Sequence, residues 1–414
     1  MLFFLPYYTY HIDDTISYHL IESKERKRKM DTKAFSTRTE YRVKDNPKIN
    51  GVNIIGLDMG YSGPKCFHGN GNFVFPNFCQ KITGEMFSDL SKSELVYEDK
   101  RTGDKYCVGD LAIKTISQDD VVDEDTIYER NHYMHPDFVI KFRTALALAL
   151  WNTQTDGSDV FLQTGLPPEY IKKDEPYLRK AIEGRHVFSL QMGKEKKDFD
   201  ITLSPNMIDV MYQPMGSFWS VVVDNDGNVT KDIKTYMTSN IAIFDGGFVT
   251  LDKFIVKGKQ LLRKDTNANL GMKRILEETR KQIQDEFDID ISIPAMQTCL
   301  KTGDFAVTDL INMVERRYSI ESYLETANRI VREEAFDSIK TFLPSTRYLI
   351  MTGGTGAAWY EYFKERLKGL GSLKVVPGNT NSTLPIIYSN ARGYYMYRLI
   401  QYKQKQMMQS KKGE

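Results

Sequence analysis

The sequence predicts an α/β protein built from two similar halves that face each other. Apolar, β-branched runs typical of strands alternate along the chain with amphipathic runs typical of helices. Twice, a β-run ends in Asp followed by glycine and continues into a second β-run, first at Asp58 and again at Asp245, 187 positions later. The chain has 414 residues, which is enough for two or three domains of ordinary size.

Each expected element has a local signal. Residues 52–57 are a β-branched run that ends at Asp58, and residues 71–76 read as a strand that closes a hairpin. Apolar residues share one face of a helix at 137–151, and residues 160–164 form a buried strand. Further strands are expected within 92–109 and at 207–211, 240–244, 248–256 and 348–351, and helices at 269–285, 320–343, 357–368 and 391–407.

Composition excludes several classes of protein. The chain is 41% hydrophobic and 27% charged, values of an ordinary globular protein rather than a disordered one. A net charge of +1 argues against direct DNA binding by bulk charge. Four cysteines without metal-ligand or redox spacing indicate reduced thiols in a cytoplasm, and no run of about 18 apolar residues predicts a membrane span.

Residues 1–50 read as an appended, flexible arm. Their first ten residues are apolar but lack the flanks of a signal peptide, and a basic stretch follows at 22–30. Translation from Met30 is the alternative, which would leave residues 1–29 without a role. His132 and His135 have His-x-x-His spacing, but no third ligand is near, so we expect a loop there.

The first candidate site is the segment 58–65, which reads Asp-Met-Gly-Tyr-Ser-Gly-Pro-Lys. Glycine lets backbone N–H groups approach a phosphate, and Lys65 can supply a positive charge to phosphoryl oxygens. Asp58, at a strand end, can hold hydrated Mg²⁺. An ordinary hairpin turn is the alternative for this segment taken alone.

The segment 245–252 offers the same parts in Asp245, Gly247 and Thr250. Alone it is also compatible with an ordinary turn, but two such loops can clamp a polyphosphate from both sides. Two like charges about 4 Å apart repel by roughly 4 kcal/mol at an effective dielectric near 20. The pair of acidic loops therefore implies a divalent cation, and Mg²⁺ is the natural one.

The third candidate is the segment 351–356, Met-Thr-Gly-Gly-Thr-Gly, between an expected strand and an expected helix. Its glycines allow a flat ligand to lie against the backbone, and the helix N-terminus favours an anion. It lacks the Gly-Lys-Ser/Thr ending of a Walker loop. A plain strand–turn–helix junction is the alternative, so the order of the three segments is more specific than any one of them.

This order of motifs resembles the actin-like ATPase superfamily, which includes actins, heat-shock chaperone ATPases and sugar kinases. Residues 164–167 (Thr-Gly-Leu-Pro), 245–252 and 389–395 (Ser-Asn-Ala-Arg-Gly-Tyr-Tyr) are similar to ParM-type bacterial actins, which segregate plasmids. The resemblance covers about residues 52–405. It implies an actin-like two-domain fold, a duplicated ribonuclease H-like core with a central nucleotide cleft. Pro64 and Phe248 depart from the family pattern.

The resemblance also implies roles for individual residues. Asp58 and Asp245 would hold Mg²⁺ and its water shell. The residues expected to contact the phosphates are Gly60, Ser62, Gly63 and Lys65 from the first domain and Gly247 and Thr250 from the second. Those expected to line the nucleoside are Gly353, Gly354, Thr355 and Gly356, with Lys273 near the ribose and base.

Gln213 is the candidate for positioning the attacking water. ParM-like proteins carry a Glu, and actin a Gln, after a short strand, and here residues 211–214 (Met-Tyr-Gln-Pro) fall at that place. Glutamine takes no proton at neutral pH but can orient water, as in small GTPases. The sequence therefore predicts slow hydrolysis; a simple turn residue before Pro214 is the alternative.

These observations predict domain I at 51–222 plus 385–414, with a variable insertion at about 86–139. Domain II is expected at 223–384, with a helical insertion at about 273–339. The predicted function is a bacterial, cytoplasmic ATPase (or GTPase) that forms filaments and moves plasmid DNA through a ParR-type adaptor, without direct membrane or DNA contact. The alternatives are a small-molecule kinase of the same superfamily and a non-hydrolysing nucleotide-binding relative.

Overall fold

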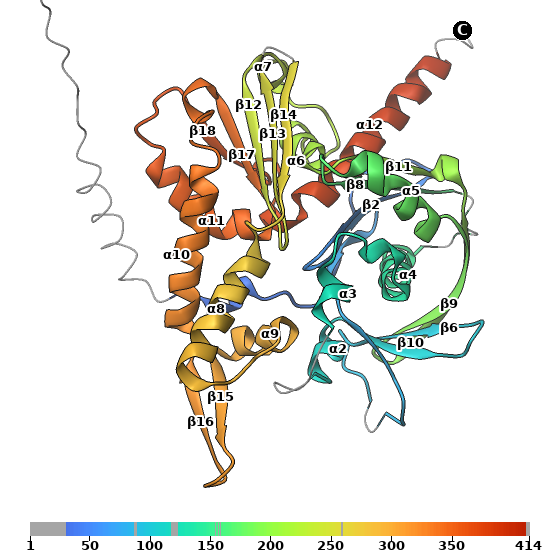
Figure 1. Cartoon of the computed structure of the whole chain (residues 1–414). Helices are drawn as coiled ribbons and strands as arrows, with labels where there is room; N and C mark the ends of the chain where they lie inside the picture. The colour runs from blue at the N-terminus through green and yellow to red at the C-terminus, as the bar shows by residue number, and fades with distance from the viewer. Residues whose placement is uncertain are drawn as a thin grey trace, which may run out of the picture.

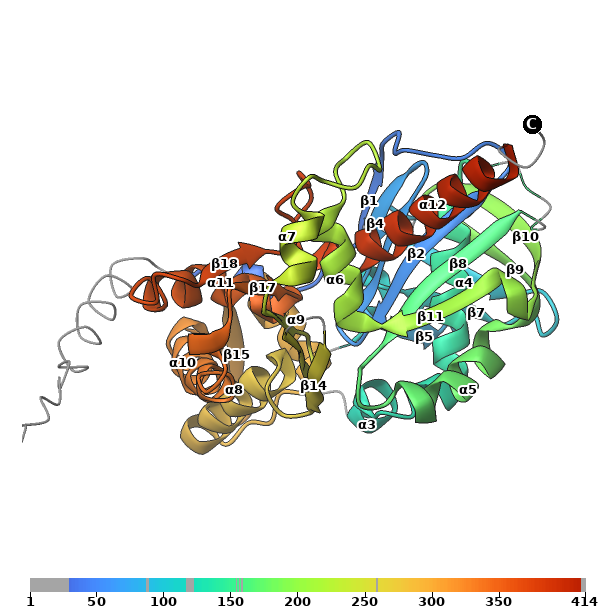
Figure 2. The same ribbon diagram turned by 90° about the horizontal axis from the view of Figure 1, so that it is seen from above.

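The computed structural model describes residues 30–410 apart from 87–88, 117–122, 154, 156, 158 and 258–259. Within these ranges the chain forms two halves, each centred on a sheet, with helices around them (Figures 1 and 2). None of the described helices combines the length and the apolar character that a membrane span requires.

The first half is centred on a sheet with strand order β1-β4-β3-β2-β8-β11. Neighbouring strands are antiparallel from β1 through β4 and β3 to β2. From β2 through β8 to β11 they are parallel. The bounds are β1 (Glu40–Val43), β2 (Asn53–Gly60), β3 (Gly63–His68), β4 (Gly71–Val74), β8 (Val160–Leu166) and β11 (Ile208–Tyr212).

The second half repeats this pattern in a sheet of order β14-β13-β12-β17-β18. Strands β14, β13 and β12 are antiparallel neighbours, and β12, β17 and β18 are parallel. The bounds are β12 (Ile241–Gly246), β13 (Leu251–Lys257), β14 (Gln260–Asn267), β17 (Tyr348–Thr352) and β18 (Lys374–Pro377). Strands β2 and β12 hold equivalent places, so Asp58 and Asp245 lie on corresponding strands of the two sheets.

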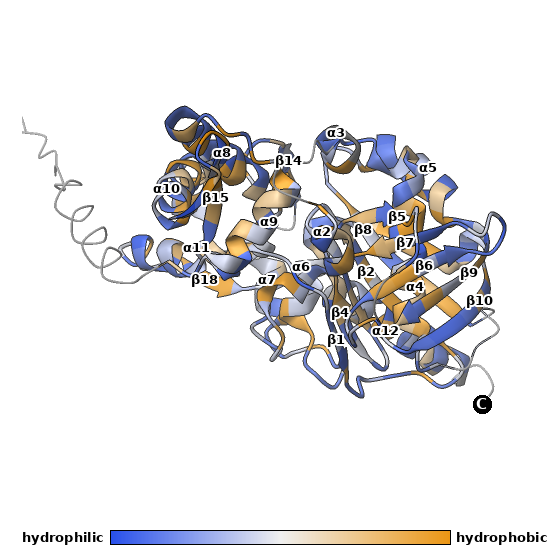
Figure 3. Ribbon diagram, turned by 90° about the horizontal axis from the view of Figure 1, so that it is seen from below, coloured by the Kyte–Doolittle hydropathy of each residue, from blue (hydrophilic) through white to orange (hydrophobic). Residues whose placement is uncertain are grey.

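Helix α4 (Pro136–Leu150) fills the space between the first sheet and a further sheet of order β10-β9-β6-β7-β5. Its side chains are buried on almost every face, including Lys141 and Arg143, as expected for a helix enclosed on all sides. Figure 3 shows hydrophobic residues concentrated on α4 and on the strands beside it. The sheet's strands are β5 (Cys79–Lys81), β6 (Leu95–Asp99), β7 (Lys105–Val108), β9 (Gly184–Met192) and β10 (Glu195–Leu203).

Two helices, α6 (Gln213–Val222) and α12 (Ser389–Ser410), lie between the halves. Their apolar side chains form one cluster with residues of both central sheets, including Ile54 of β2 and Ile243 of β12. Figure 2 shows α12 crossing the first sheet. These two helices therefore help to set how the strand ends of one half lie relative to those of the other.

The helical insertion of the second half contains α8 (Met272–Phe287), α9 (Ile293–Thr302) and α10 (Glu321–Asp337). A two-stranded hairpin, β15 (Asp304–Asp309) and β16 (Val314–Ser319), leaves it and projects from the body of the molecule (Figure 1). The other helices are α2 (Asp110–Lys114), α3 (Glu124–Tyr128), α5 (Ile171–Ile182), α7 (Ile233–Thr238) and α11 (Gly354–Arg366), and 3-10 turns lie at η1 (Thr32–Phe35), η2 (His132–Met134), η3 (Pro205–Met207), η4 (Leu343–Ser345) and η5 (Ile386–Tyr388).

Part of the segment expected to be a flexible N-terminal arm is built into the fold. Turn η1 contacts α9 and α11, and strand β1 pairs with β4 at the edge of the first sheet. The side chain of Phe35 is buried in the core of the second half. The remainder of the expected arm, residues 1–29, lies outside the described residues.

Candidate functional site

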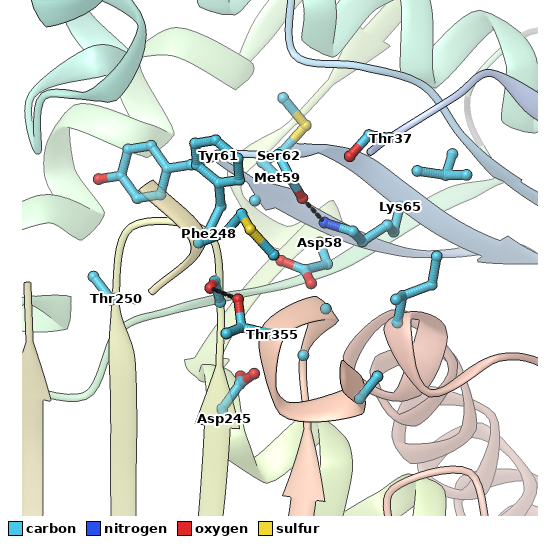
Figure 4. Close-up of a pocket in the computed structure, with 18 of the residues that line it drawn as sticks. Thr37, Asp58, Met59, Tyr61, Ser62, Lys65, Asp245, Phe248, Thr250 and Thr355 are labelled. Carbon is cyan, nitrogen blue, oxygen red and sulfur yellow. Dashed lines mark hydrogen bonds between the residues drawn. The ribbon is translucent and has the colours of Figure 1, made fainter. Parts of the chain in front are cut away.

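A cavity of about 850 Å³ opens between the two halves. Figure 4 shows residues of both halves that project into it. Its volume falls within the roughly 300–1,000 Å³ that is usual for small-molecule sites. The sequence-predicted residues that line it are Asp58, Gly60, Ser62, Lys65, Gln213, Asp245, Gly247, Thr250, Gly353, Gly354 and Thr355.

The first predicted loop is a β-hairpin rather than an irregular loop. Asp58 on β2 and Lys65 on β3 are directly opposite each other in the ladder, which the turn at Tyr61 and Ser62 closes. The Lys65 ammonium donates to Ser62 Oγ at 2.7 Å and to the Gly63 carbonyl at 3.0 Å. The hairpin therefore presents a carboxylate, an ammonium and a hydroxyl to the cavity from adjacent positions.

The second predicted loop has the same ladder geometry with a different charge. Asp245 on β12 is directly opposite Asp252 on β13, so an acid stands where the first half has Lys65. Asp252 is fully buried and accepts from the hydroxyls of Thr266 at 2.5 Å and Thr250 at 3.4 Å. Burial and the neighbouring Asp245 raise the pKa of Asp252 well above its ordinary value.

Asn390, in the first turn of α12, joins the acidic residues of the two halves. Its amide N–H donates to Asp245 Oδ2 at 2.7 Å, and the amide lies near enough to Asp58 to lower the pKa of that carboxyl group, against the larger effect of burial. The Asn390 oxygen accepts from Ser217 Oγ of α6 at 2.5 Å, which fixes the orientation of the amide. Asp58 and Asp245 therefore both line the cavity and lie near enough to affect each other's charge.

The third loop packs directly against the second. Gly353 has φ = 79°, and a Cβ there would lie 2.2 Å from the Gly246 carbonyl and 2.7 Å from Asp245 Oδ1, so only glycine fits. Thr355 Oγ1 donates to the Gly247 carbonyl at 2.6 Å. This contact leaves the N-terminus of α11 at the cavity wall, where its free N–H groups favour an anion.

Gln213 occupies the first position of α6, and its side chain lies near Asp245, whose pKa it lowers against the larger effect of burial. Pro214 follows it at a position where the missing N–H costs no helical hydrogen bond. Together, α6 and α11 direct two helix N-termini into the cavity, and both favour negative charge there.

The electrostatics of the cavity call for a cation. Burial is the main cause that raises the pKa of Asp58, and it raises the pKa of Asp245 to about 7, with the neighbouring Asp58 adding to the effect. Burial also lowers the pKa of Lys65. Lys65 is the base that opposes these upward shifts at Asp58 and Asp245, and Asp58 and Asp245 in turn raise the pKa of Asp252.

The residues present fit a magnesium ion that is held largely by a ligand. Among the described residues, no group of three or more His, Cys, Asp or Glu side chains is arranged to hold a metal by itself. Mg²⁺, however, is usually bound by one or two carboxylates together with waters and substrate phosphates. Asp245 Oδ1 is buried without a hydrogen-bond partner, which suits an oxygen that contacts such a hydrated ion.

Three predicted residues do not line the cavity. Gly63 packs against the backbone carbonyl of Phe75, and Gly356 packs against Gly246. Lys273 pairs with Glu277 at 3.2 Å and lies over the ring of Tyr128. Their predicted contacts with the nucleotide remain predictions.

Sequence reasoning missed Asp252, the bridging role of Asn390, and the cavity wall formed by residues 31–38. Asp252 follows Asp245 by seven residues, just as Lys65 follows Asp58 by seven residues. This equal spacing was a usable signal that Asp252 belongs to the site. Asn390 stood within the motif at 389–395, but its partners come from distant parts of the chain, so the sequence gives no local sign of them.

Comparison with known proteins agrees with this geometry. Residues 56–216 match a family model described as the N-terminal domain of actin-like proteins. No curated protein matches the chain by sequence.

Solved structures match over most of the chain. A non-polymerisable quadruple mutant of pCBH ParM has a TM-score of 0.65 at 18% identity, over 83% of this chain and 98% of that chain. A 15-stranded ParM filament from Clostridium botulinum has a TM-score of 0.62 at 17% identity, over 84% and 98%. Bacillus thuringiensis ParM with AMPPNP has a TM-score of 0.55 at 18% identity, over 85% and 100%.

The repeated sheet topology and the cavity between the two halves define an actin-like α/β fold, as predicted. Within the first half, residues 56–216 match the N-terminal domain of actin-like proteins. Several of the solved structures to which its fold is similar are of the ParM type, so the predicted resemblance is confirmed.

Proposed function

We propose that the chain binds ATP, or GTP, with Mg²⁺ in the cavity and hydrolyses it slowly to control its own assembly into filaments. The observation that carries this proposal is that Asp58 and Asp245, from opposite halves, line one cavity near the amide of Asn390. Equivalent strands of the two sheets place these acids at one point, beside an ammonium, glycine turns and two helix N-termini. A metal-bound polyphosphate satisfies all of these groups together.

The proposed roles follow from where each side chain lies. Lys65 and the backbone near Gly60 and Ser62 contact phosphoryl oxygens from the first half, while Gly247 and Thr250 contact them from the second. Asp58 and Asp245 hold the hydrated Mg²⁺, which offsets the negative charge of the phosphates. The nucleoside lies toward Gly353, Gly354 and Thr355.

Gln213 orients the attacking water in this proposal. Its amide lies near Asp245 at the N-terminus of α6, so it can position a water but cannot remove its proton at neutral pH. Hydrolysis therefore depends on positioning and on the electrostatics of the cavity rather than on a general base.

We also propose that domain I (51–222 plus 385–414) and domain II (223–384) move as two bodies about α6 and α12. Nucleotide contacts both halves, so its hydrolysis changes their preferred separation and hence the fit between neighbouring subunits. Head-to-tail contacts that do not close into a ring produce filaments. The filament would carry plasmid DNA through a DNA-binding adaptor of the ParR type.

Three measurements on one preparation test the proposal. Calorimetry with ATP and GTP, each with and without Mg²⁺, should show uptake that depends on magnesium. Phosphate release should be slow, and electron microscopy should show filaments only with nucleotide.

Other outcomes select the alternatives. Phosphorylation of an added small molecule would identify a kinase, and binding without phosphate release would identify a non-hydrolysing relative. A matched variant, Asp58→Asn, should abolish the magnesium dependence of binding; retention of that dependence would reject Asp58 as a ligand.

A further inference from the structure

Residues 30–39 form a segment, here called the strap, that joins the second half to the first. At its start, the Met30 N–H donates to Glu321 Oε1 of α10 at 2.8 Å, and Thr32 Oγ1 donates to the Leu300 carbonyl of α9 at 2.9 Å. Phe35 is buried in the core of the second half. Directly after the strap, β1 pairs with β4 in the first half. The strap is therefore fastened at both ends to different halves.

The middle of the strap is held where the halves approach each other. The Thr37 N–H donates to Gln297 Oε1 of α9 at 3.3 Å. The Thr39 N–H donates to the carboxylate of Asp110 on α2, and the same carboxylate pairs with Lys301 of α9. Asp110 thus joins the strap, the first half and the second half at one point.

The strap also forms part of the cavity wall. Asp31, residues 33–38 and Lys301 line the same cavity as the phosphate-facing residues. Figure 4 shows Thr37 in the same cavity as Ser62 and Lys65. About 850 Å³ stays open with the strap in place, a volume typical of an occupied small-molecule site. The strap therefore acts as a wall of the site and not as a plug.

We propose that the strap is a gate of the nucleotide site, which must detach from α9 and α10 before the bound nucleotide leaves. This inference rests on the proposed nucleotide binding. The strap crosses between the two halves whose separation opens the cavity, so opening stretches or breaks its bonds to α9 and α10. The bonds to α9 from Thr32 and Thr37 are single neutral hydrogen bonds, whereas β1 is held by a strand ladder, so the strap releases from the second half first.

The test removes two anchors of the strap without changing the cavity lining. The double variant Thr32→Ala, Gln297→Ala deletes the hydrogen bonds to Leu300 and Thr37, and neither residue lines the cavity. Dissociation of a fluorescent ATP analogue with Mg²⁺, followed by stopped flow, should become roughly tenfold faster or more, since each lost bond shifts the opening equilibrium severalfold. The matched control is Gln191→Ala, which removes a comparable bond from β9, away from the strap.

Each outcome decides between the two proposals. If the double variant releases the analogue at the rate of the unaltered chain and of the control, the gate is rejected while nucleotide binding stands. If the unaltered chain binds no analogue, nucleotide binding is rejected and the gate with it.

Amide hydrogen exchange on the unaltered chain gives a second readout that does not depend on variants folding. Exchange at Thr37 and Thr39 should slow when nucleotide and Mg²⁺ are bound, because the occupied cavity holds the strap closed. Equal exchange with and without nucleotide would overturn the gate.

Discussion

Gln213 lines the cavity at the start of α6, near Asp245, in the position from which a water could be oriented. Replacing it with alanine should slow single-turnover phosphate release by roughly 100-fold, the cost typical of lost positioning. Binding of ATP with Mg²⁺, measured by calorimetry, should change little because no phosphate contact is lost. Gln282→Ala, on α8, is a matched control. Unchanged phosphate release from the Gln213 variant would reject its assigned role.

His68 makes the stability of the chain depend on pH. Burial lowers the pKa of His68 to about 4, below its ordinary value of 6.5, and its Nε2 has no hydrogen-bond partner among the described residues. The unfolded chain therefore binds more protons than the folded chain between these two values. The contribution of the neutral imidazole to the free energy of unfolding is fully present above pH 6.5. It is lost as the pH falls towards 4, and the loss is at most about 3 kcal/mol.

The measurement is the free energy of unfolding from denaturant titrations between pH 7 and pH 4.5. The free energy of unfolding of the unaltered chain minus that of His68→Leu should decrease as the pH falls, because only the unaltered chain loses stability through this group. A difference that stays constant with pH would contradict the assignment. Burial also lowers the pKa of His132, to about 3. His132 is present in both chains, so its effect on stability cancels in the difference.

At the residue scale, the sequence predicts side chains that carry local signals. Asp58 and Asp245 could be found because each follows a β-run and precedes glycine, so two local patterns located both acids. Asn390 could not be assigned a role in this way, since its partners Ser217 and Asp245 lie 173 and 145 residues away. Its function follows from the crossing of two helices, which no local pattern encodes.

At the scale of elements, the crossing of α6 and α12 depends on two glycines. A Cβ on Gly393 would lie 1.6 Å from the Gly216 carbonyl, and a Cβ on Gly216 would lie 2.7 Å from the Asn390 carbonyl. The backbones of the two helices are therefore nearly in contact. This close approach brings Asn390 within reach of both acidic residues.

Gly393→Ala should force the two helices apart. We expect a loss of about 1–3 kcal/mol in the free energy of unfolding, the usual cost of overpacking, together with weaker binding of ATP and Mg²⁺ because Asn390 moves. Unfolding in denaturant and calorimetry measure the two effects. Gly369→Ala is the control, since a Cβ there meets nothing within 4 Å. Equal stability of the two variants would show that the crossing tolerates the added methyl group.

Helices with a long apolar face were predictable, whereas several strands were not, among them the buried strand β3. The helices expected at 137–151 and 391–407 correspond to α4 and α12, because their apolar residues recur at helical spacing. The hairpin of β15 and β16 was missed within the insertion expected to be helical. Most of its side chains are partly or fully exposed, so it shows little of the alternation that marks a strand.

At the scale of the whole molecule, the internal repeat was visible in the sequence, but contacts between the insertions were not. Glu124 of α3 pairs with Arg280 of α8 at 3.2 Å and accepts from the Ile293 N–H of α9 at 2.7 Å. Tyr128 stacks on Phe248 across the same boundary. These contacts depend on how far the two halves close, a property of the assembled fold rather than of any segment.

The tip of the hairpin of β15 and β16 is the surface at which we expect a second copy of the chain to bind. Leu310, Ile311 and Met313 are 78%, 92% and 81% exposed, at the end of an element that projects from the body (Figure 1). Side chains this exposed contribute little to folding, so their substitution should change stability by less than about 0.5 kcal/mol. Burial of an isoleucine at a subunit contact, by contrast, is worth about 1.5–3 kcal/mol.

Ile311→Asp should therefore raise the critical concentration for nucleotide-dependent assembly roughly tenfold or more, as measured by sedimentation and light scattering. Nucleotide binding should be unaffected, because the hairpin does not line the cavity. Thr308→Asp introduces the same charge at an exposed position lower on the same hairpin and should assemble nearly as the unaltered chain does. If both variants assemble normally, the subunit contact lies elsewhere; if both fail equally, the added charge and not the apolar tip is responsible.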